Sequence, residues 1–355
     1  MGRLADDITR FLEYNGFECS LQMRYDFDVI CVKTLDGKMS RIIMPLEIKD
    51  HTLEDAIKSS ENAWEAVRMM SGHEGYPLII TEDRWMRQGD MMKARLLAHL
   101  ELFSQAYARN CEVRRIGKAE AQAFLKENHS YGYAACRYRY GLFLRRHTGH
   151  IAEELRSLDS ARDDSQEKRN DSPEKWDDSL EKWDDSREDR DDSREDRKTS
   201  NGHIGNLIAV ATFSNARRWI KDGKEISSYE WTRYASLPGM RVSGGMGKLL
   251  KAFINDVHPD DIMSYADLEW SEGSVYKALG FRAELGKEPV DFVVDGQTWE
   301  RRAMRSLDKL GMTEGGSRMT EGRSGMTEGR SRMTGELFFR NFGSRKFRLK
   351  LTDYR

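Results

Sequence analysis

Residues 233–281 read RYASLPGMRVSGGMGKLLKAFINDVHPDDIMSYADLEWSEGSVYKALGF, and the order of patterns in this stretch decides the expected fold. A glycine loop (244–247) leads into apolar residues at helical spacing. The strand-like run IMSYAD (262–267) follows, and then a second helical run with Ser271 as its expected cap and Gly280 as its expected stop. Glycines let backbone N–H groups converge, and a helix start adds partial positive charge. This order therefore indicates a loop that binds the diphosphate of a phosphorylated cofactor.

The stretch resembles the cofactor half of the GNAT acyltransferase superfamily, whose lYxxLGF ending is matched by residues 275–281. The resemblance implies a GNAT-like mixed-sheet domain that transfers an acyl group from acetyl-CoA or another acyl-CoA to an amine. Tyr276 would protonate the leaving thiolate, and Glu230 and Asp267 are the candidate bases. Val242 stands where the family usually has Gln or Arg, and Arg241 is adjacent. The residues that would bind the cofactor are Arg241, Val242, Gly244, Gly245, Gly247 and Lys248.

A closer resemblance is to the GNAT-like domains of phage and mobile-element proteins, including the Mom-type DNA modification proteins. It rests on the run SYAD (264–267), followed by Gly273 and Tyr276. Similar domains are also appended to phage homing endonucleases. This kinship implies a nucleic-acid setting rather than one particular reaction. The same loop and tyrosine are also compatible with inherited architecture that no longer binds an acyl-CoA.

The N-terminal part carries a second group of candidate residues. Two strand-like runs, 26–32 and 41–50, follow a helical stripe, and the second run is apolar at alternating positions. Glu47 and Lys49 share the opposite face of that run, and Asp28 lies in the neighbouring strand. Two carboxylates on adjacent strands can share a hard cation such as Mg²⁺, and a lysine can stabilise charge that develops on a phosphate. A solvated pair of charges is the alternative interpretation.

The order helix, three strands, helix, strand resembles the PD-(D/E)xK nuclease superfamily, with a helix-Gly-Phe opening at residues 15–17. This resemblance implies a restriction-endonuclease-like α/β domain. Asp28 and Glu47 would bind the metal, Lys49 would be catalytic, and Phe27 replaces the family's proline. A capping box of Thr52 and Asp55 predicts the start of the next helix, and residues 76–83 predict the next buried strand.

Two low-complexity inserts distort the charge of this 355-residue chain, which is −2 overall. Residues 157–199 repeat a heptad such as DDSLEKW and carry 17 acids against 10 bases, so the rest of the chain carries +5. A second heptad of the type MTEGRSG recurs at 312–332 and adds one net positive charge between 306 and 334. Neither repeat has the paired apolar positions of a coiled coil, so we expect both to be disordered and functionally passive. An acidic mimic of nucleic acid is the alternative for the first.

Outside the inserts, basic and aromatic residues alternate in three segments, 136–143, 215–219 and 340–350. Basic side chains neutralise phosphates and aromatic rings stack on unpaired bases, so DNA or another nucleic acid is a possible partner. A strand edge with charged outer residues is the alternative for the first segment. The candidate contacts are Arg137, Arg139, Arg217, Arg218, Arg345 and Lys346.

The cysteine spacing and the length of the apolar runs indicate where the protein is expected to be located. The four cysteines show no CxxC spacing, and no apolar run approaches the roughly 20 residues that cross a bilayer. With no signal-peptide core, the expected location is the cytoplasm and no membrane partner is expected. We expect two α/β (α+β) domains, a nuclease-like domain at 1–115 and a GNAT-like domain at 116–355, interrupted by inserts at 152–202 and 306–335.

Three functions remain open from the sequence. The first is an acyl-CoA-dependent N-acyltransferase of mobile-element type, fused to a nuclease-like domain and acting on or near nucleic acid. The second is a Mg²⁺-dependent DNA endonuclease whose GNAT-like domain serves only DNA binding. The third is a DNA-binding protein in which both sites have decayed.

Overall fold

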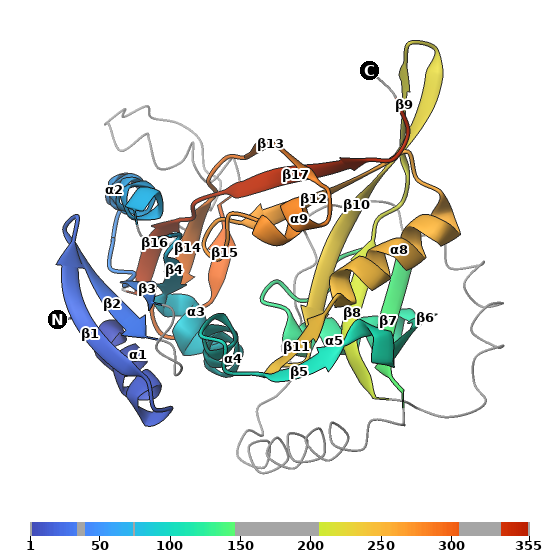
Figure 1. Ribbon diagram of the computed structural model, residues 1–355. Helices are drawn as coiled ribbons and strands as arrows, with labels where there is room; N and C mark the ends of the chain where they lie inside the picture. Colours follow the sequence, from blue (N-terminus) through green and yellow to red (C-terminus); the bar gives the residue numbers. More distant parts are fainter. Residues whose placement is uncertain (1, 34–39, 74, 146–205, 305–334, 354–355) are drawn as a thin grey trace, which may run out of the picture. The chain divides into compact units, whose positions relative to one another are not determined.

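The computed structural model describes residues 2–33, 40–73, 75–145, 206–304 and 335–353 (Figure 1). The predicted inserts, apart from Gly335, lie outside the described residues, so their predicted disorder stays a prediction. The chain is a mixture of helices and several sheets, which confirms the α+β class. It divides into two compact units: unit 1 contains residues 1–103, 215–232 and 259–355, and unit 2 contains residues 104–214 and 233–258. This partition differs from the predicted boundary at residue 115.

Unit 1 begins with a four-stranded sheet of order β1-β2-β3-β4, antiparallel except for the parallel pair β3–β4. The helix between β3 and β4 makes this parallel connection possible. The elements are α1 (Arg3–Tyr14), β1 (Glu18–Arg24), β2 (Phe27–Lys33), β3 (Ser40–Leu46), α2 (Leu53–His73), β4 (Leu78–Thr81), α3 (Glu82–Arg87) and α4 (Gly89–His99). The predicted order helix, three strands, helix, strand is confirmed.

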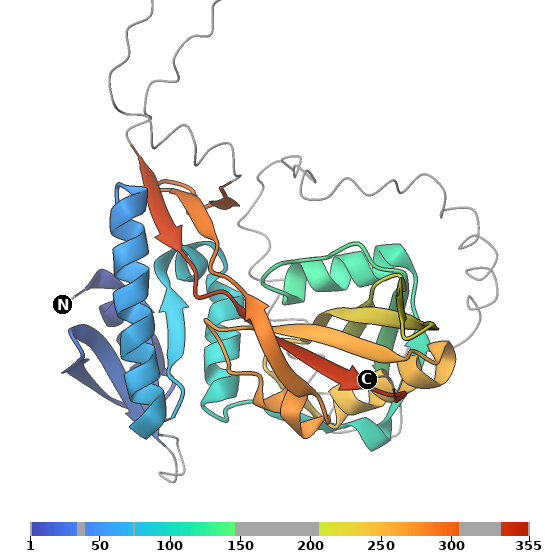
Figure 2. The ribbon, with the colours of Figure 1, turned by 90° about the horizontal axis from the view of Figure 1, so that it is seen from above.

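Helices cover both faces of this sheet (Figures 1 and 2). Alternate strand residues point to opposite faces, so Ile30 and Ile43 pack with α1 and α4. Val29, Ile42 and Met44 face the other way and pack with α2. The predicted capping box at the start of α2 is confirmed, because Thr52 Oγ1 accepts a hydrogen bond from Asp55 N at 3.1 Å.

The rest of unit 1 contains two further groups of strands. One follows the order β13-β17-β12-β10, with β9 paired to β10, and the other follows the order β15-β14-β16. The elements are β9 (Arg217–Lys221), β10 (Lys224–Ser236), β12 (Asp261–Asp267), α9 (Ser274–Ala278), β13 (Arg282–Lys287), β14 (Asp291–Asp295), β15 (Arg301–Ala303), β16 (Glu336–Arg340) and β17 (Ser344–Lys350). Residues of β10 after Thr232 belong to unit 2. Strand β16 packs on α2, and Phe338 N donates to Asp50 O at 2.8 Å.

Unit 2 contains an antiparallel sheet of order β6-β7-β8 and the parallel pair β5–β11. Helix α8 packs on one face of β7 through Phe253, and α5 packs on the other face near Phe143. The elements are β5 (Ser104–Tyr107), η1 (Ala108–Asn110), β6 (Cys111–Arg115), α5 (Lys118–Asn128), β7 (Tyr138–Leu144), β8 (Leu207–Phe213), β11 (Met240–Ser243) and α8 (Gly245–Val257). The β7–β8 ladder pairs Tyr138 with Phe213 at one end and Phe143 with Leu207 at the other, so the two strands flank the first insert in sequence.

Three predicted element boundaries are wrong. The strand expected over 76–83 is shorter, because β4 spans only Leu78–Thr81 and Glu82 already begins α3. The strand expected over 41–50 ends at Leu46, because β2 begins only at Phe27 and β4 ends at Thr81, which leaves the next residues without ladder partners. Helix α9 begins after Gly273 rather than Ser271, because Gly273 takes a left-handed φ of 79° and Ser271 Oγ accepts its N–H. Among the helices that the structure describes, none has the length and apolar character needed to cross a bilayer.

A buried cluster of charges connects three segments of unit 1. Arg301 of β15 binds both carboxylate oxygens of Asp83, at 2.6 and 2.8 Å, and lies 3.1 Å from Glu269 Oε1. Arg84 lies 3.2 Å from Glu269 and from Asp267. Asp83 and Glu269 are only 2% and 1% exposed. Burial raises the pKa of Asp83, but Arg301, together with Thr81 and Arg84, outweighs it and holds that pKa below its usual range.

We expect Arg301→Met to lower the free energy of unfolding by about 3–5 kcal/mol, because it leaves two buried carboxylates with only part of their compensating charge. Arg302→Met on the same strand is the matched control. Arg302 is 67% exposed and lies 3.8 Å from Glu336, so its loss should cost less than about 1 kcal/mol. Urea titration of both variants measures the difference, and equal losses would contradict this role of the cluster.

Candidate active site

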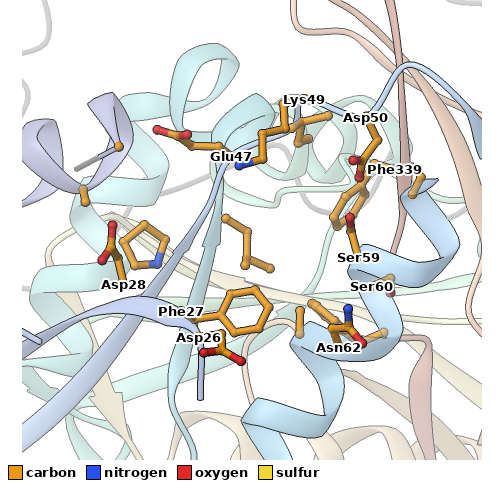
Figure 3. A pocket seen from close by; sticks show the side chains of 18 of the residues that line it. Asp26, Phe27, Asp28, Glu47, Lys49, Asp50, Ser59, Ser60, Asn62 and Phe339 are labelled. Atoms are coloured by element: carbon orange, nitrogen blue, oxygen red, sulfur yellow. The ribbon is translucent and has the colours of Figure 1, made fainter. Parts of the chain in front are cut away.

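A cavity of about 550 Å³ lies in unit 1 between the ends of β2 and β3 and helix α2. It brings together the three residues predicted from the sequence: Asp28 from β2, and Glu47 and Lys49 from the segment after β3. Figure 3 shows the Asp28 and Glu47 carboxylates toward one side of the cavity and Ser59 and Phe339 toward the other. Glu47 and Lys49 are exposed, so water and a substrate can reach them.

Strand pairing explains how residues separated in sequence meet here. The β2–β3 ladder runs antiparallel and ends at Ile30↔Ile43, so the start of β2 and the end of β3 leave the ladder together. Asp28 lies on that start of β2, and Glu47 follows that end of β3. Both Glu47 and Lys49 line the cavity, although the segment that carries them is no longer a strand.

Glu47 also lies at the first turn of α1. Leu4 N donates to Glu47 Oε1 at 3.4 Å, and a Cβ built on Gly2 would overlap the Glu47 carboxylate. Helix starts carry partial positive charge, so a carboxylate at this position stabilises the start of α1. Gly2, which has no side chain, therefore leaves room for the Glu47 carboxylate.

Glu82 is a second carboxylate near the same segment, and it was not among the residues predicted from the sequence. Its Oε2 accepts a hydrogen bond from Ile48 N at 3.1 Å, so it holds the backbone between Glu47 and Lys49. Burial raises the pKa of Glu82, the Ile48 N–H lowers it, and the nearby charge of Glu47 raises it again. The overall pKa of Glu82 lies above its usual range.

The donors in the cavity suit a hard divalent cation. Asp28 and Glu47 offer carboxylate oxygens, and Mg²⁺ commonly binds proteins through one or two carboxylates while it keeps several waters. Within the described ranges, no three His, Cys, Asp or Glu side chains are grouped closely enough to hold a metal by themselves. A cation held by Asp28 and Glu47 would therefore have to complete its coordination with water.

The predicted cofactor loop lies in unit 2. Gly244 takes a left-handed φ of 75° and caps the N-terminus of α8, which begins at Gly245 and includes Gly247. Val242 is buried and Arg241 is exposed. Lys248 Nζ donates to Ala108 O at 2.8 Å and to Cys111 O at 2.6 Å, so this amine anchors β6 to α8.

The three candidates for acyl transfer chemistry lie in unit 1. The Tyr276 hydroxyl lies 2.9 Å from Ser264 Oγ, and its ring stacks on Phe347 at 5.1 Å between centroids. Burial raises the pKa of Tyr276, so the phenol keeps its proton at neutral pH. Glu230 lies 3.7 Å from Arg217 and Asp267 lies 3.2 Å from Arg84, so each carboxylate has a cationic neighbour.

The candidate nucleic-acid contacts differ in exposure. Arg217 and Arg218 on β9 are 64% and 72% exposed. Arg345 and Lys346 on β17 are partly buried and pair with Glu272 and Glu284. In unit 2, Arg137 is exposed just before β7, whereas Arg139 is 8% exposed and donates to Cys136 O.

Comparison with models of known protein families gives no match, and comparison with curated proteins gives none either.

Sequence reasoning missed Glu82, and it also missed Asp26 and Asn62, which line the cavity. A signal for Glu82 was present, because it directly follows the strand that pairs in parallel with the strand leading to Glu47. Carboxyl ends of parallel neighbours meet at one edge of a sheet.

We expect Glu47→Gln to lower the pKa of Glu82, since the Glu47 charge is one cause of its elevation. Asp28→Asn is the matched control, because Asp28 is not among the groups that shift the Glu82 pKa. Carboxyl-carbon NMR titration of Glu82 in both variants measures the change. An unchanged pKa in Glu47→Gln would show that the two carboxylates do not interact.

Proposed function

We propose that this protein is a Mg²⁺-dependent nuclease that hydrolyses phosphodiester bonds in DNA. The observation that carries the proposal is that Asp28, Glu47 and Lys49 all line one and the same cavity. The resemblance of residues 1–115 to the PD-(D/E)xK superfamily supports the same assignment. The helix and strand order that this resemblance implies agrees with α1 to β4.

Each residue has a role that follows from its chemistry. Asp28 and Glu47 would hold one Mg²⁺, which supplies Lewis-acid activation of the phosphodiester and of a water molecule when it is bound. The Lys49 ammonium would stabilise negative charge that develops on the phosphate oxygens. Glu82 positions the segment that carries Glu47 and Lys49 through its hydrogen bond to Ile48 N.

The exposed basic residues support a nucleic-acid substrate. Arg217 and Arg218 extend from β9, and they lie 3.7 Å and 3.4 Å from their carboxylate neighbours on β10, Glu230 and Glu225. Exposed ion pairs of this kind contribute little free energy, so phosphates can replace these partners at small cost.

We expect Lys49→Ala and Glu47→Ala each to lower the Mg²⁺-dependent cleavage rate of plasmid or branched DNA by about 100-fold or more. Lys58→Ala is the matched control: Lys58 is an exposed lysine of α2 that pairs with Glu54 at 2.7 Å and does not line the cavity. Its rate should equal that of the unsubstituted protein. Cleavage that persists in Lys49→Ala and Glu47→Ala would refute the assigned site.

A second candidate function is acyl transfer from acetyl-CoA or another acyl-CoA, and the left-handed Gly244 at the start of α8 favours it. Backbone N–H groups at such a helix start suit a diphosphate. The resemblance to GNAT-like domains of mobile-element proteins supports this candidate. In that case Tyr276 would be the acid, with Glu230 or Asp267 as the base.

Calorimetric titration of acetyl-CoA tests this second candidate. We expect saturable binding that is lost in Gly247→Asp, because the new carboxylate would repel the diphosphate. An acidic residue in the first turn of a helix favours the helix itself, so the variant should still fold. An absence of binding to the folded, unsubstituted protein would remove the acyltransferase candidate.

A further inference from the structure

We propose that the cavity accepts one unpaired nucleobase beside the scissile phosphate, so that the substrate is branched or frayed DNA rather than a continuous duplex. The proposal rests on the nuclease function proposed above. It concerns the space in the cavity that a phosphate bound at Asp28, Glu47 and Lys49 would leave unoccupied. Size, charge and the character of the lining each support it.

The cavity is larger than a phosphate site requires. Its volume of about 550 Å³ falls in the range of roughly 300–1,000 Å³ that is typical of pockets for whole small molecules. Figure 3 shows that the lining continues beyond Asp28 and Glu47 toward Ser59, Asn62 and Phe339. A nucleotide can therefore enter with its base as well as its phosphate.

The charge of the lining favours a neutral group in most of this space. Besides the two carboxylates assigned to the metal, Asp26 and Asp50 line the cavity, against the one ammonium of Lys49. Like charges repel, so a row of duplex phosphates is disfavoured here. A single phosphate can pair with the Lys49 ammonium, and an uncharged base beside it is not repelled by the carboxylates.

The lining offers both a stacking surface and hydrogen-bonding groups. Met23 pairs with Asp28 across the β1–β2 ladder, lines the cavity and is 74% exposed. Directly opposed residues of a ladder share one face, so this apolar side chain lies beside the carboxylate that would bind the metal. Phe27 adds an aromatic ring to the same lining, and the exposed Asn62 adds an amide that can donate to and accept from a base edge.

The test measures binding of forked DNA with Ca²⁺ in place of Mg²⁺, so that affinity is determined without turnover. One fork carries a base at the first unpaired position, and the matched fork carries an abasic sugar there. We expect the abasic fork to bind about tenfold more weakly, as the loss of one stacked base implies. Met23→Ala should weaken binding of the fork with the base and leave binding of the abasic fork unchanged.

Met69→Ala is the matched control, because Met69 is an exposed methionine of α2 (46% exposed) that does not line the cavity. It should discriminate between the two forks as strongly as the unsubstituted protein. Met23 is so exposed that its substitution should leave folding intact, and melting temperatures verify this. Equal affinity for both forks would overturn the proposal, and so would discrimination that survives Met23→Ala.

Cleavage of the same forks with Mg²⁺ separates this inference from the proposed function. Met23-dependent discrimination without any cleavage would uphold the base pocket and remove the nuclease function. Cleavage of forks and continuous duplex at equal rates, with equal affinity for both forks, would uphold the nuclease and overturn the base pocket.

Discussion

The bidentate pairing of Arg301 with Asp83 is the interaction on which the rest of unit 1 depends. Asp83 lies on α3, directly after β4, and β4 pairs in parallel with β3. The same arginine reaches Glu269 beyond β12, so one guanidinium connects three segments that are far apart in sequence. A buried charge is costly unless it is paired, so these segments are stable only when they are together. The cluster thereby fixes the edge of the sheet from which Glu47 and Lys49 extend.

This dependence explains why the first sheet and the C-terminal strands form one compact unit. Residues 1–103 alone would leave Asp83 without Arg301 and Arg84 without Glu269. The C-terminal strands also cover α2, where Phe338 packs on Ala56. Composition and periodicity are read along the sequence, so they do not reveal ion pairs between distant segments. The sequence therefore predicts two consecutive domains divided at residue 115, rather than a unit that combines both ends of the chain.

Local pattern was sufficient to predict most elements around the site. The apolar stripe of α1, the capping box at Thr52 and the alternation in β3 each express a period that the backbone imposes. It was not sufficient for the end of β3, because a strand continues only while a neighbour supplies ladder hydrogen bonds. Ile48 N bonds to Glu82 instead, and that partner is 34 residues away. The contact of Glu82 with this segment, like the end of the strand, therefore depends on residues far apart in the sequence, which a local pattern does not include.

The site also depends on the two-residue turn between β1 and β2. Tyr25 and Asp26 take left-handed φ values of 50° and 65°, which glycine or asparagine adopts more readily. Each such residue costs on the order of 1 kcal/mol, and surrounding structure has to stabilise it. A longer turn would shift the register by one residue and move Asp28 to the opposite face of the sheet. The strained turn is thus the condition for Met23 and Asp28 to face the same cavity, where stacking surface and metal ligand are needed together.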